Sequence, residues 1–453
     1  MKRILFNVFI ILSGLFCQSE LFAQSKAPEL LATNNPDILL KQIKANMKID
    51  ADSTLMLLSN WSDYEPVKDV GRDYKFYYTD ADYGKIPLRV YIPANYQNTR
   101  KTPCVLQLHG AVGQSKFSDI DSLADSDEGI LTDPLKANNY IIIQPLGDKS
   151  KGFTWGGNKW LGSGQAYHFN LTYKKLTEII TALKQVLNID DNRVYAFGHS
   201  DGSDGAIGLA VYKPDQFAGV VAYNTMFKNL FTHDYYIRNV QNRPLYEVHS
   251  DKDKLRRIGM NRQIIDSIKK FDKRITYKEY TGYEHWDKHL GIDAPYADKF
   301  MKGVIRNPYQ SNIYLETTQN SPYNSCDWLT ITKPDTSRKS AAWYNVFDVR
   351  YKEYLETRQL WIEGNYYEPL KSAVVQASYK DNVFTLQTSA TNEVELKISA
   401  EMVDLNKPIT VMANGKQVFK EKVKADKSFL LNGFQKTFDR QALWVNSIKI
   451  KID

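Results

Sequence analysis

Between about residues 72 and 305, short apolar runs alternate with segments of helical periodicity. The runs that predict strands lie at 74–78, 88–92, 104–108, 140–144, 194–197, 218–223, 245–248 and 275–280. Apolar residues at helical spacing predict helices over 173–187, 204–212, 264–271 and 294–304. Alternation of this kind, with strands that are apolar along their whole length, is typical of a parallel sheet covered by helices on both faces. We therefore expect an α/β domain over 72–305.

Beyond residue 305 the helical periodicity mostly disappears, and β-type runs take its place. These runs lie at 312–317, 328–332, 373–379, 383–388, 394–398, 409–413 and 444–452. Asn414-Gly415 separates two of the runs and predicts a two-residue hairpin, since both turn positions need positive φ. The pattern predicts a smaller, mostly-β, sandwich-like domain over 306–453. Residues 24–71, which precede the α/β domain, have polar helical spacing and predict a helical lead-in.

The first 23 residues have the pattern of a secretory signal peptide. Lys2 and Arg3 form a basic N-terminal region, a short apolar stretch follows, and Ala23 is a small residue at the expected cleavage site. Cys17 leaves open a lipoprotein signal, although the bulky Phe16 before it disfavours that alternative. No later run reaches the length that spans a bilayer, so we expect no membrane span. The expected location is secreted or periplasmic.

Composition and charge narrow the classes of function. The 453 residues carry a net charge of +7, which is small for this length, and no basic cluster points to nucleic acid. After the signal peptide only Cys104 and Cys326 remain; two buried thiols are favoured, and a disulfide is left open. The sequence has neither CxxC nor HExxH, so it predicts no metal site and no cofactor.

The strongest chemical signal is the segment Gly198-His199-Ser200-Asp201-Gly202. It follows a predicted strand and opens a helix of small residues. A serine nucleophile is exposed by such a tight, strained turn, and glycines on either side leave room where strand and helix crowd together. We therefore take Ser200 as the candidate nucleophile.

A serine is a weak nucleophile and needs a base together with a group that orients the base. Asp253 follows the strand at 245–248 and is the candidate acid, with Asp251 as its competitor. His285 follows the strand at 275–280 and is the candidate base, while His289 lies further from the strand end. The order serine, acid, histidine is the one this architecture uses.

An oxyanion formed during acyl transfer needs two preorganised N–H donors. One donor is expected to be the N–H of Asp201, directly after the nucleophile. The other is expected from the loop His109-Gly110-Ala111-Val112-Gly113, with the N–H of Ala111 as the candidate.

Together these segments resemble the α/β-hydrolase fold over about residues 72–305. The resemblance matches Gly198–Gly202 to the nucleophile elbow, His109-Gly110 to the oxyanion loop, and Asp253 and His285 to the acid and base. The loop reads His-Gly-Ala-Val-Gly rather than His-Gly-Gly-Gly, which leaves the second donor open. Residues 305–453 resemble the β-rich region attached to secreted bacterial hydrolases of the esterase and prolyl oligopeptidase-like group.

The loop at 147–167 is rich in aromatic residues and follows a strand at the edge of the sheet where ligands bind. Trp155 and Trp160 are candidates for substrate binding by stacking on sugar or aromatic acyl groups, although they could equally plug a small core of the loop. His109 is a further substrate-binding candidate, and it is also placed to brace its own loop.

These features predict a secreted serine hydrolase that cleaves carboxylic esters through an acyl-enzyme, with a small-molecule or polysaccharide ester as substrate and acylated carbohydrate as the favoured class. Two alternatives stay open. One is a serine peptidase of the prolyl oligopeptidase type, although the residues before the hydrolase domain are too few for a propeller. The other is a carbohydrate-binding protein with an inert hydrolase domain.

Overall fold

The computed structural model describes residues 40–41, 43–46, 48–124, 129–155, 169–348, 350–355, 359–365 and 369–452. The predicted signal peptide with Cys17, most of the lead-in before residue 40, and Trp160 lie outside these residues. Among the described helices, none combines the length and the apolar character that crossing a bilayer requires.

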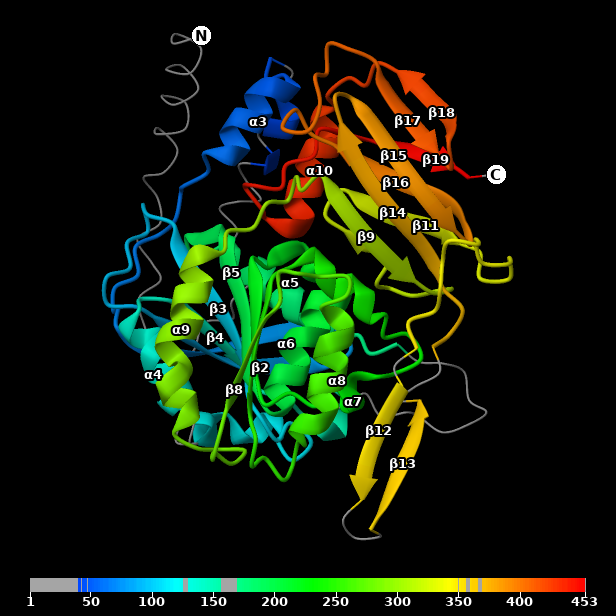
Figure 1. Ribbon diagram of the computed structural model, residues 1–453. Helices are drawn as coiled ribbons and strands as arrows, with labels where there is room; N and C mark the ends of the chain where they lie inside the picture. The colour runs from blue at the N-terminus through cyan, green and yellow to red at the C-terminus, as the bar shows by residue number, and fades with distance from the viewer. Residues whose placement is uncertain are drawn as a thin grey trace.

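An eight-stranded sheet forms the centre of the larger part (Figure 1). Its strands in spatial order are β1 (Arg72–Asp80), β2 (Gly84–Ile92), β4 (Ile141–Pro145), β3 (Thr102–Leu108), β5 (Ile189–His199), β6 (Gly219–Tyr223), β7 (Leu245–Ser250) and β8 (Thr276–Tyr280). The pairs from β4 to β8 are parallel, whereas β1 with β2 and β2 with β4 are antiparallel. The parallel strands β3 to β7 are largely buried, as their apolar runs predict, whereas the edge strand β8 has no buried residue.

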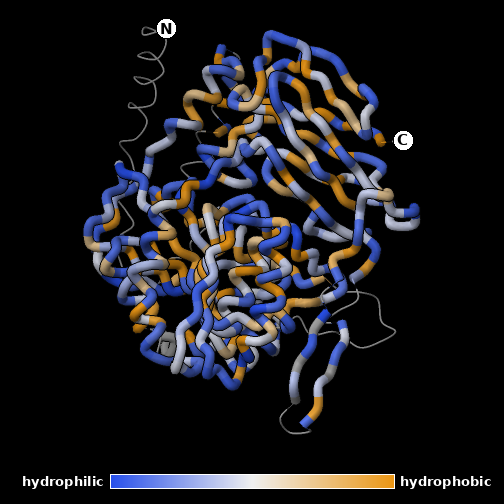
Figure 2. Tube along the Cα trace, in the orientation of Figure 1, coloured by the Kyte–Doolittle hydropathy of each residue, from blue (hydrophilic) through white to orange (hydrophobic). Residues whose placement is uncertain are grey.

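Helices cover both faces of this sheet (Figure 1). On one face lie α5 (Thr172–Lys184), α6 (Asp201–Tyr212) and α8 (Ile258–Ile268), which share the main apolar core with the strands. On the other face lie α4 (Gly129–Ala137) and α9 (His289–Gly303), which share a second core. Short helical turns complete this part: η1 (Phe117–Ala124), η2 (Lys149–Lys151), η3 (Pro214–Gln216), α7 (Phe227–Leu230) and η4 (Ile237–Asn242). Figure 2 shows apolar residues gathered along the central strands.

The C-terminal part is a β-sandwich. One sheet has the order β18 (Lys416–Glu421), β17 (Ile409–Ala413), β15 (Val383–Ser389), β14 (Ala373–Lys380), β9 (Asn312–Thr317). The other has the order β10 (Ser325–Cys326), β11 (Leu329–Pro334), β16 (Thr391–Ile398), β19 (Asn446–Lys451). Apolar side chains of both sheets form one shared core. Asn414 and Gly415 have φ of 50° and 83° and join β17 to β18, so the hairpin prediction is confirmed.

Several elements were not predicted from the sequence. They are α4, the hairpin of β12 (Arg350–Leu355) and β13 (Leu360–Asn365), and α10 (Lys427–Thr437). The hairpin lies apart from the sandwich and packs against α8 (Figure 1). Helix α10 packs against α3 (Ala51–Ser59), the described helix of the lead-in, through a small apolar cluster. The N-terminal lead-in is therefore anchored on the C-terminal part of the chain.

Buried ion pairs join the two parts. Arg243, two residues before β7, donates to Asp327 at 2.5 Å, and Arg306, which bonds to Asn192 of β5 as well, donates to Asp439 at 2.7 and 2.8 Å. Arg440 donates to Asp191 of β5 at 2.7 Å. Because both partners of each pair are buried, removing one would leave a desolvated charge.

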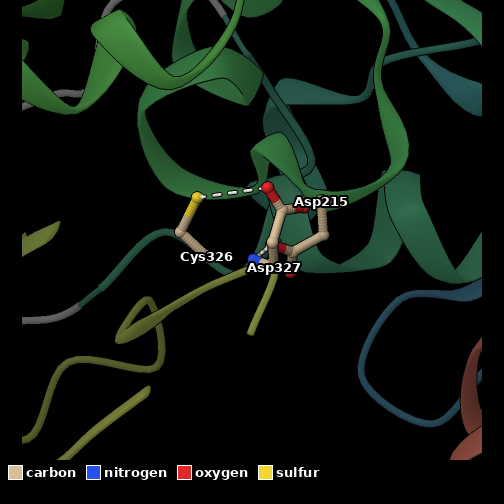
Figure 3. A group of neighbouring side chains, drawn as sticks. All are labelled: Asp215, Cys326 and Asp327. Carbon is tan, nitrogen blue, oxygen red and sulfur yellow. Dashed lines mark hydrogen bonds between the residues drawn. The ribbon is translucent and has the colours of Figure 1, made fainter. Parts of the chain in front are cut away.

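One part of this joint brings together three side chains that could hold a cation. Within the described residues, the potential ligand atoms of Asp215, Cys326 and Asp327 lie within 4.8 Å of one another (Figure 3). However, Asp327 accepts from Arg243 and Gln310, and its backbone N–H donates to Asp215 at 2.7 Å. These oxygens are already engaged, so the group acts as a polar connection between the two parts. Cys104 and Cys326 are both buried and free.

Candidate active site

Ser200 stands at a strained turn between β5 and α6. Its φ of 58° and ψ of −128° lie outside the regions that non-glycine residues ordinarily adopt. The flanking glycines make this turn sterically feasible. A Cβ on Gly198 would lie 2.2 Å from the backbone of Gly202, and a Cβ on Gly202 would lie 1.8 Å from the carbonyl oxygen of Leu108. The expectation that both glycines leave room at a crowded turn is confirmed.

The structure brings Ser200, His285 and Asp253 together at the carboxyl edge of the sheet. Ser200 Oγ lies 2.9 Å from His285 Nε2, and His285 Nδ1 lies 2.6 Å from Asp253 Oδ2. Ser200 and His285 are partly exposed, whereas Asp253 is buried. The distances let a proton pass from the hydroxyl to the imidazole while the carboxylate holds the ring.

Asp253 is held as an ionised acceptor. Its Oδ1 accepts from the backbone N–H groups of Leu255 and Arg256, and its Oδ2 accepts from Asn224 as well as from His285. Burial raises the pKa of this carboxyl, but the hydrogen bonds from His285, Asn224 and Arg256 outweigh burial and lower its pKa to about 2. A carboxylate ionised at neutral pH favours the Nδ1–H tautomer of the imidazole and stabilises its protonated form.

The competing residues lie in other surroundings. Asp251 accepts from the backbone N–H of Gly282 at 2.6 Å and thereby ties together the two loops that carry the acid and the base. His289 is fully buried, and its Nε2 lies 2.9 Å from the side-chain oxygen of Asn224. Burial lowers the pKa of His289 to about 4, so its ring is neutral at pH 7. The geometry thus pairs Ser200 with His285 and His285 with Asp253.

The loop after β3 approaches the nucleophile through its backbone. A Cβ on Gly110 would lie 3.3 Å from the Cβ of Ser200, so the loop and the nucleophile turn lie close together. Ala111, the next residue, is exposed and has a positive φ of 49°. The N–H of Val112 is already used, because it donates to Asp201 Oδ2 at 3.1 Å. This arrangement agrees with Ala111 and Asp201 as the N–H donors, a role that stays a proposal.

Arg256 braces the start of α6 and was not predicted. Its guanidinium donates to Asp201 at 2.6 Å and to Asp204 at 2.7 Å, and all but 4% of the residue is buried. Burial lowers the pKa of Arg256, but the neighbouring carboxylates outweigh burial and raise it. Asp201 therefore has two tasks, since its side chain links Arg256 to the oxyanion loop while its N–H lies beside Ser200.

His199 and Asn224 also contribute without having been predicted as functional. The Nε2–H of His199 donates to the backbone carbonyl of His285 at 2.8 Å. Asn224 bonds to Ser250, Asp253 and His289, and it has a positive φ of 51°. The sequence contained one signal for Asn224, because it directly follows the strand β6 at the edge where functional residues gather.

Two expectations for substrate binding need correction. Trp155 is 1% exposed, donates from Nε1 to the carbonyl of His109 at 3.0 Å and packs edge-on against the His109 ring, so the expectation of an exposed stacking surface is wrong. His109 is also buried: its Nε2 accepts from the N–H of Gly147 at 3.1 Å, and its Nδ1–H donates to the carbonyl of Gly110. Burial lowers the pKa of His109, so it braces the loop as a neutral ring. Trp160 lies outside the described residues.

Comparison with known proteins finds a matching family model and several similar solved structures. The model of the Esterase family, described as "Putative esterase", matches residues 83–363, which is more than half of the chain. Solved structures with similar coordinates include a thermostable esterase, with 19% identity and a TM-score of 0.43 over 52% of this chain and 63% of that chain. The alignment thus spans less than two thirds of that esterase.

Two further solved structures are similar at lower identity. An S-formylglutathione hydrolase from Agrobacterium tumefaciens has 15% identity and a TM-score of 0.40, over 52% of this chain and 95% of that chain. The fluorophosphonate-binding serine hydrolase FphF of Staphylococcus aureus has 15% identity and a TM-score of 0.38, over 51% and 99%. A search of the curated proteins finds no match. On the family match, which covers more than half of its length, this chain belongs to the Esterase family.

Proposed function

We propose that this esterase works through a Ser200–His285–Asp253 triad and that its substrates are acyl esters of carbohydrates. The observation that carries the triad is the unbroken series of hydrogen bonds from Ser200 Oγ through the His285 ring to Asp253, at 2.9 and 2.6 Å. The distances match those of a nucleophile, a base and an orienting acid.

The reaction then follows in two halves. Ser200 Oγ attacks the ester carbonyl, and its proton passes to His285 Nε2. The oxyanion that forms accepts hydrogen bonds from the N–H groups of Asp201 and Ala111. As the carbon–oxygen bond to the alcohol breaks, His285 returns the proton to the leaving alcohol, and the acyl group stays on Ser200. Water then attacks the acyl-enzyme while His285 Nε2 takes its proton, and that proton passes to Ser200 Oγ as the bond between Oγ and the acyl carbon breaks and the carboxylic acid leaves.

The preference for a carbohydrate ester rests on the surface beside the acid. A cleft of about 660 Å³ lies between the loop Asp251–Lys254, the start of α8 and the hairpin of β12 and β13. On the hairpin, Tyr354 and Trp361 are 41% and 60% exposed, and their ring centroids are 5.4 Å apart. Exposed aromatic rings beside polar and charged side chains suit the apolar face of a sugar or an aryl acid.

The triad is tested with a fluorophosphonate probe and with an aryl acetate as substrate. We expect the wild-type protein to be labelled and to hydrolyse the ester, and Ser200→Ala to lose both properties while keeping its circular dichroism spectrum. Ser118→Ala, an exposed serine away from the elbow, is the matched control and should behave as the wild type. Labelling that persists in Ser200→Ala would refute the triad.

The substrate class is tested separately. We expect acetylated or feruloylated xylan fragments to be deacylated with a higher kcat/KM than the unsubstituted aryl acetate. The variant Trp361→Ala should lower kcat/KM on the xylan fragments and leave kcat/KM on the aryl acetate unchanged. Equal losses on both substrates would contradict a sugar-binding role of the hairpin. Release of dipeptides from a proline-containing peptide would favour the peptidase alternative.

Export of the chain is a further part of this proposal and rests on the pattern of residues 1–23 alone. N-terminal sequencing of the protein recovered outside the cytoplasm is expected to begin at Gln24. A first residue at Cys17 would indicate a lipoprotein instead.

A further inference from the structure

A second cleft lies where the C-terminal sandwich meets the hydrolase part of the chain. It has a volume of about 710 Å³. The loop before β7, the loop between α8 and β8, and the strands β9, β14 and β15 form its walls. The cleft therefore depends on both parts of the molecule, and the buried ion pairs of the joint hold those parts together.

The sandwich wall presents two rows of hydrogen-bonding side chains across three strands. Gln376 on β14 is opposite Gln387 on β15 and opposite Tyr314 on β9. Two residues further along β14, Ser378 is opposite Thr385 and Asn312. Because side chains two residues apart point to the same face of a sheet, these rows form one surface. All of them line the cleft, and Asn312, Gln376, Thr385 and Gln387 are exposed.

This surface carries hydroxyl and amide groups but no charge. Exposed positions of β18, at the edge of the same sheet, carry Lys416, Lys420 and Glu421 instead. An amide supplies both donors and an acceptor, and a hydroxyl can do either, so the rows can bond to a ligand that is itself rich in hydroxyl groups. A charged ligand would find no compensating charge on this wall.

The opposite wall belongs to the hydrolase part and holds one charge of each sign. Arg274 donates through Nε to Asp272 Oδ1 at 3.3 Å, and both residues line the cleft. Asp272 is 4% exposed, and its Oδ2 has no hydrogen-bond partner among the described residues. The guanidinium of Arg274 is half-exposed and offers further N–H donors to a ligand in the cleft, while Asp272 balances its charge. Phe271 adds apolar surface to this wall.

The second cleft is separate from the triad. Its hydrolase wall lies at the amino ends of β7 and β8, whereas Asp253 and His285 follow the carboxyl ends of the same strands. The six residues of β7 span about 20 Å at about 3.3 Å per residue. Substitutions in the cleft should therefore leave the chemistry at Ser200 intact.

We propose that this cleft binds a neutral carbohydrate chain and that it anchors the enzyme to a polysaccharide at a distance from the catalytic serine. A neutral glycan offers many hydroxyl groups and no charge, which matches the amide and hydroxyl rows on one wall and the balanced Asp272–Arg274 pair on the other. Binding at the cleft does not require the ester reaction, so the proposal stands independently of the triad.

The test is affinity electrophoresis of the full chain in native gels that contain soluble arabinoxylan, galactomannan or mixed-linkage β-glucan, with polygalacturonate as the acidic comparison. We expect at least one neutral polymer to retard the wild-type protein. The variant Gln376→Ala/Gln387→Ala should bind that polymer about tenfold or more weakly, since two side chains lose their hydrogen bonds. Its kcat/KM on an aryl acetate should not change.

Lys416→Ala, on the edge strand outside the cleft, is the matched control and should be retarded like the wild type. Retardation by polygalacturonate alone, or by none of the polymers, would overturn the proposal. Retardation that survives the double substitution would place glycan binding elsewhere and would overturn it as well. A loss of aryl acetate hydrolysis in Ser200→Ala with unchanged retardation would show that the two sites are independent.

Discussion

The Nε2–H of His199 donates a hydrogen bond to the main-chain carbonyl of His285 at 2.8 Å. The residue next to the candidate nucleophile thus positions the backbone of the candidate base. Since a carbonyl oxygen can only accept, Nε2 of His199 carries the proton. Burial and the neighbouring His285 hold the pKa of His199 well below its usual value, so the ring stays neutral while His285 takes up a proton.

Replacing His199 should therefore affect the rate rather than substrate binding. In His199→Ala the His285 loop loses its anchor, and small misplacements of a catalytic group are costly. We expect kcat on an aryl acetate to fall about ten- to hundredfold with little change in KM. His199→Gln, which retains an N–H donor, should recover part of the loss. Equal kcat in His199→Ala and the wild type would contradict this positioning role.

The choice between the two loop carboxylates gives a second prediction. Asp253 bonds to His285, whereas Asp251 bonds to the backbone of Gly282. Asp253→Asn should lower kcat by roughly 10⁴-fold, because the amide no longer holds the required tautomer of the imidazole. Asp251→Asn is the matched control, and its kcat should fall less than about tenfold since only a loop contact changes. The reverse order of effects would assign the acid to Asp251.

Much of the site could be predicted because strand ends have defined positions. Ser200, Asp253 and His285 each follow a strand of one parallel sheet, and the carboxyl ends of such strands meet at one edge. Sequence position alone therefore brings the three side chains close together. Their assigned roles stay proposals.

The residues that support the site could not be predicted from the sequence, because their contacts depend on tertiary packing. Arg256 bonds to Asp201 and Asp204, more than fifty positions earlier in the chain, and only the packing of the loop after β7 against α6 brings them together. Exposure is likewise a property of packing, which is why the sequence could not decide between an exposed Trp155 and one buried in a core of its loop; the structure shows it buried. The helix α10 was missed because it is short. Its few apolar residues pack against α3, which lies far away in the sequence.

Arg256 should be critical for stability. It is the cation beside Asp204, a fully buried carboxylate whose pKa burial raises. Arg256→Met would leave that carboxylate without its partner, and we expect the free energy of unfolding to fall by about 3–5 kcal/mol in urea denaturation. Arg257→Met changes an exposed neighbour and should cost less than about 1 kcal/mol. Similar losses in both variants would argue against a special role of Arg256.

Adding a side chain at the elbow glycine Gly202 should cause a steric clash. A Cβ there would lie 1.8 Å from the carbonyl oxygen of Leu108, and neither backbone can yield without moving β3 away from α6. Gly202→Ala should therefore lower the free energy of unfolding by more than about 3 kcal/mol and displace Ser200. Gly259→Ala, in α8 with no atom within 4 Å of the added Cβ, should stabilise the protein by about 0.5–1 kcal/mol. A stable, active Gly202→Ala variant would contradict the crowded turn.

His289 should make stability depend on pH below neutrality. Burial lowers its pKa from 6.5 to about 4 in the folded state, although Asp287, Asp293 and Asp253 nearby oppose that shift. Because the unfolded chain then takes up the proton first, this residue destabilises the fold progressively as the pH falls from about 6.5 to about 4. The full effect is at most about 3.5 kcal/mol, since one pKa unit corresponds to about 1.4 kcal/mol.

The measurement is urea denaturation of the wild type and of His289→Gln at several pH values between 4 and 7. The side chain of Gln can still donate to Asn224 but does not titrate, so the variant should lose stability less steeply on acidification. The stability advantage of the wild type should shrink as the pH falls through this range, because only the wild type is penalised by protonation of the unfolded chain. Parallel curves for the two proteins would mean that His289 contributes nothing to the acid sensitivity of the fold, and that the cost of acidification arises at His199, at His109 or at the carboxylates instead.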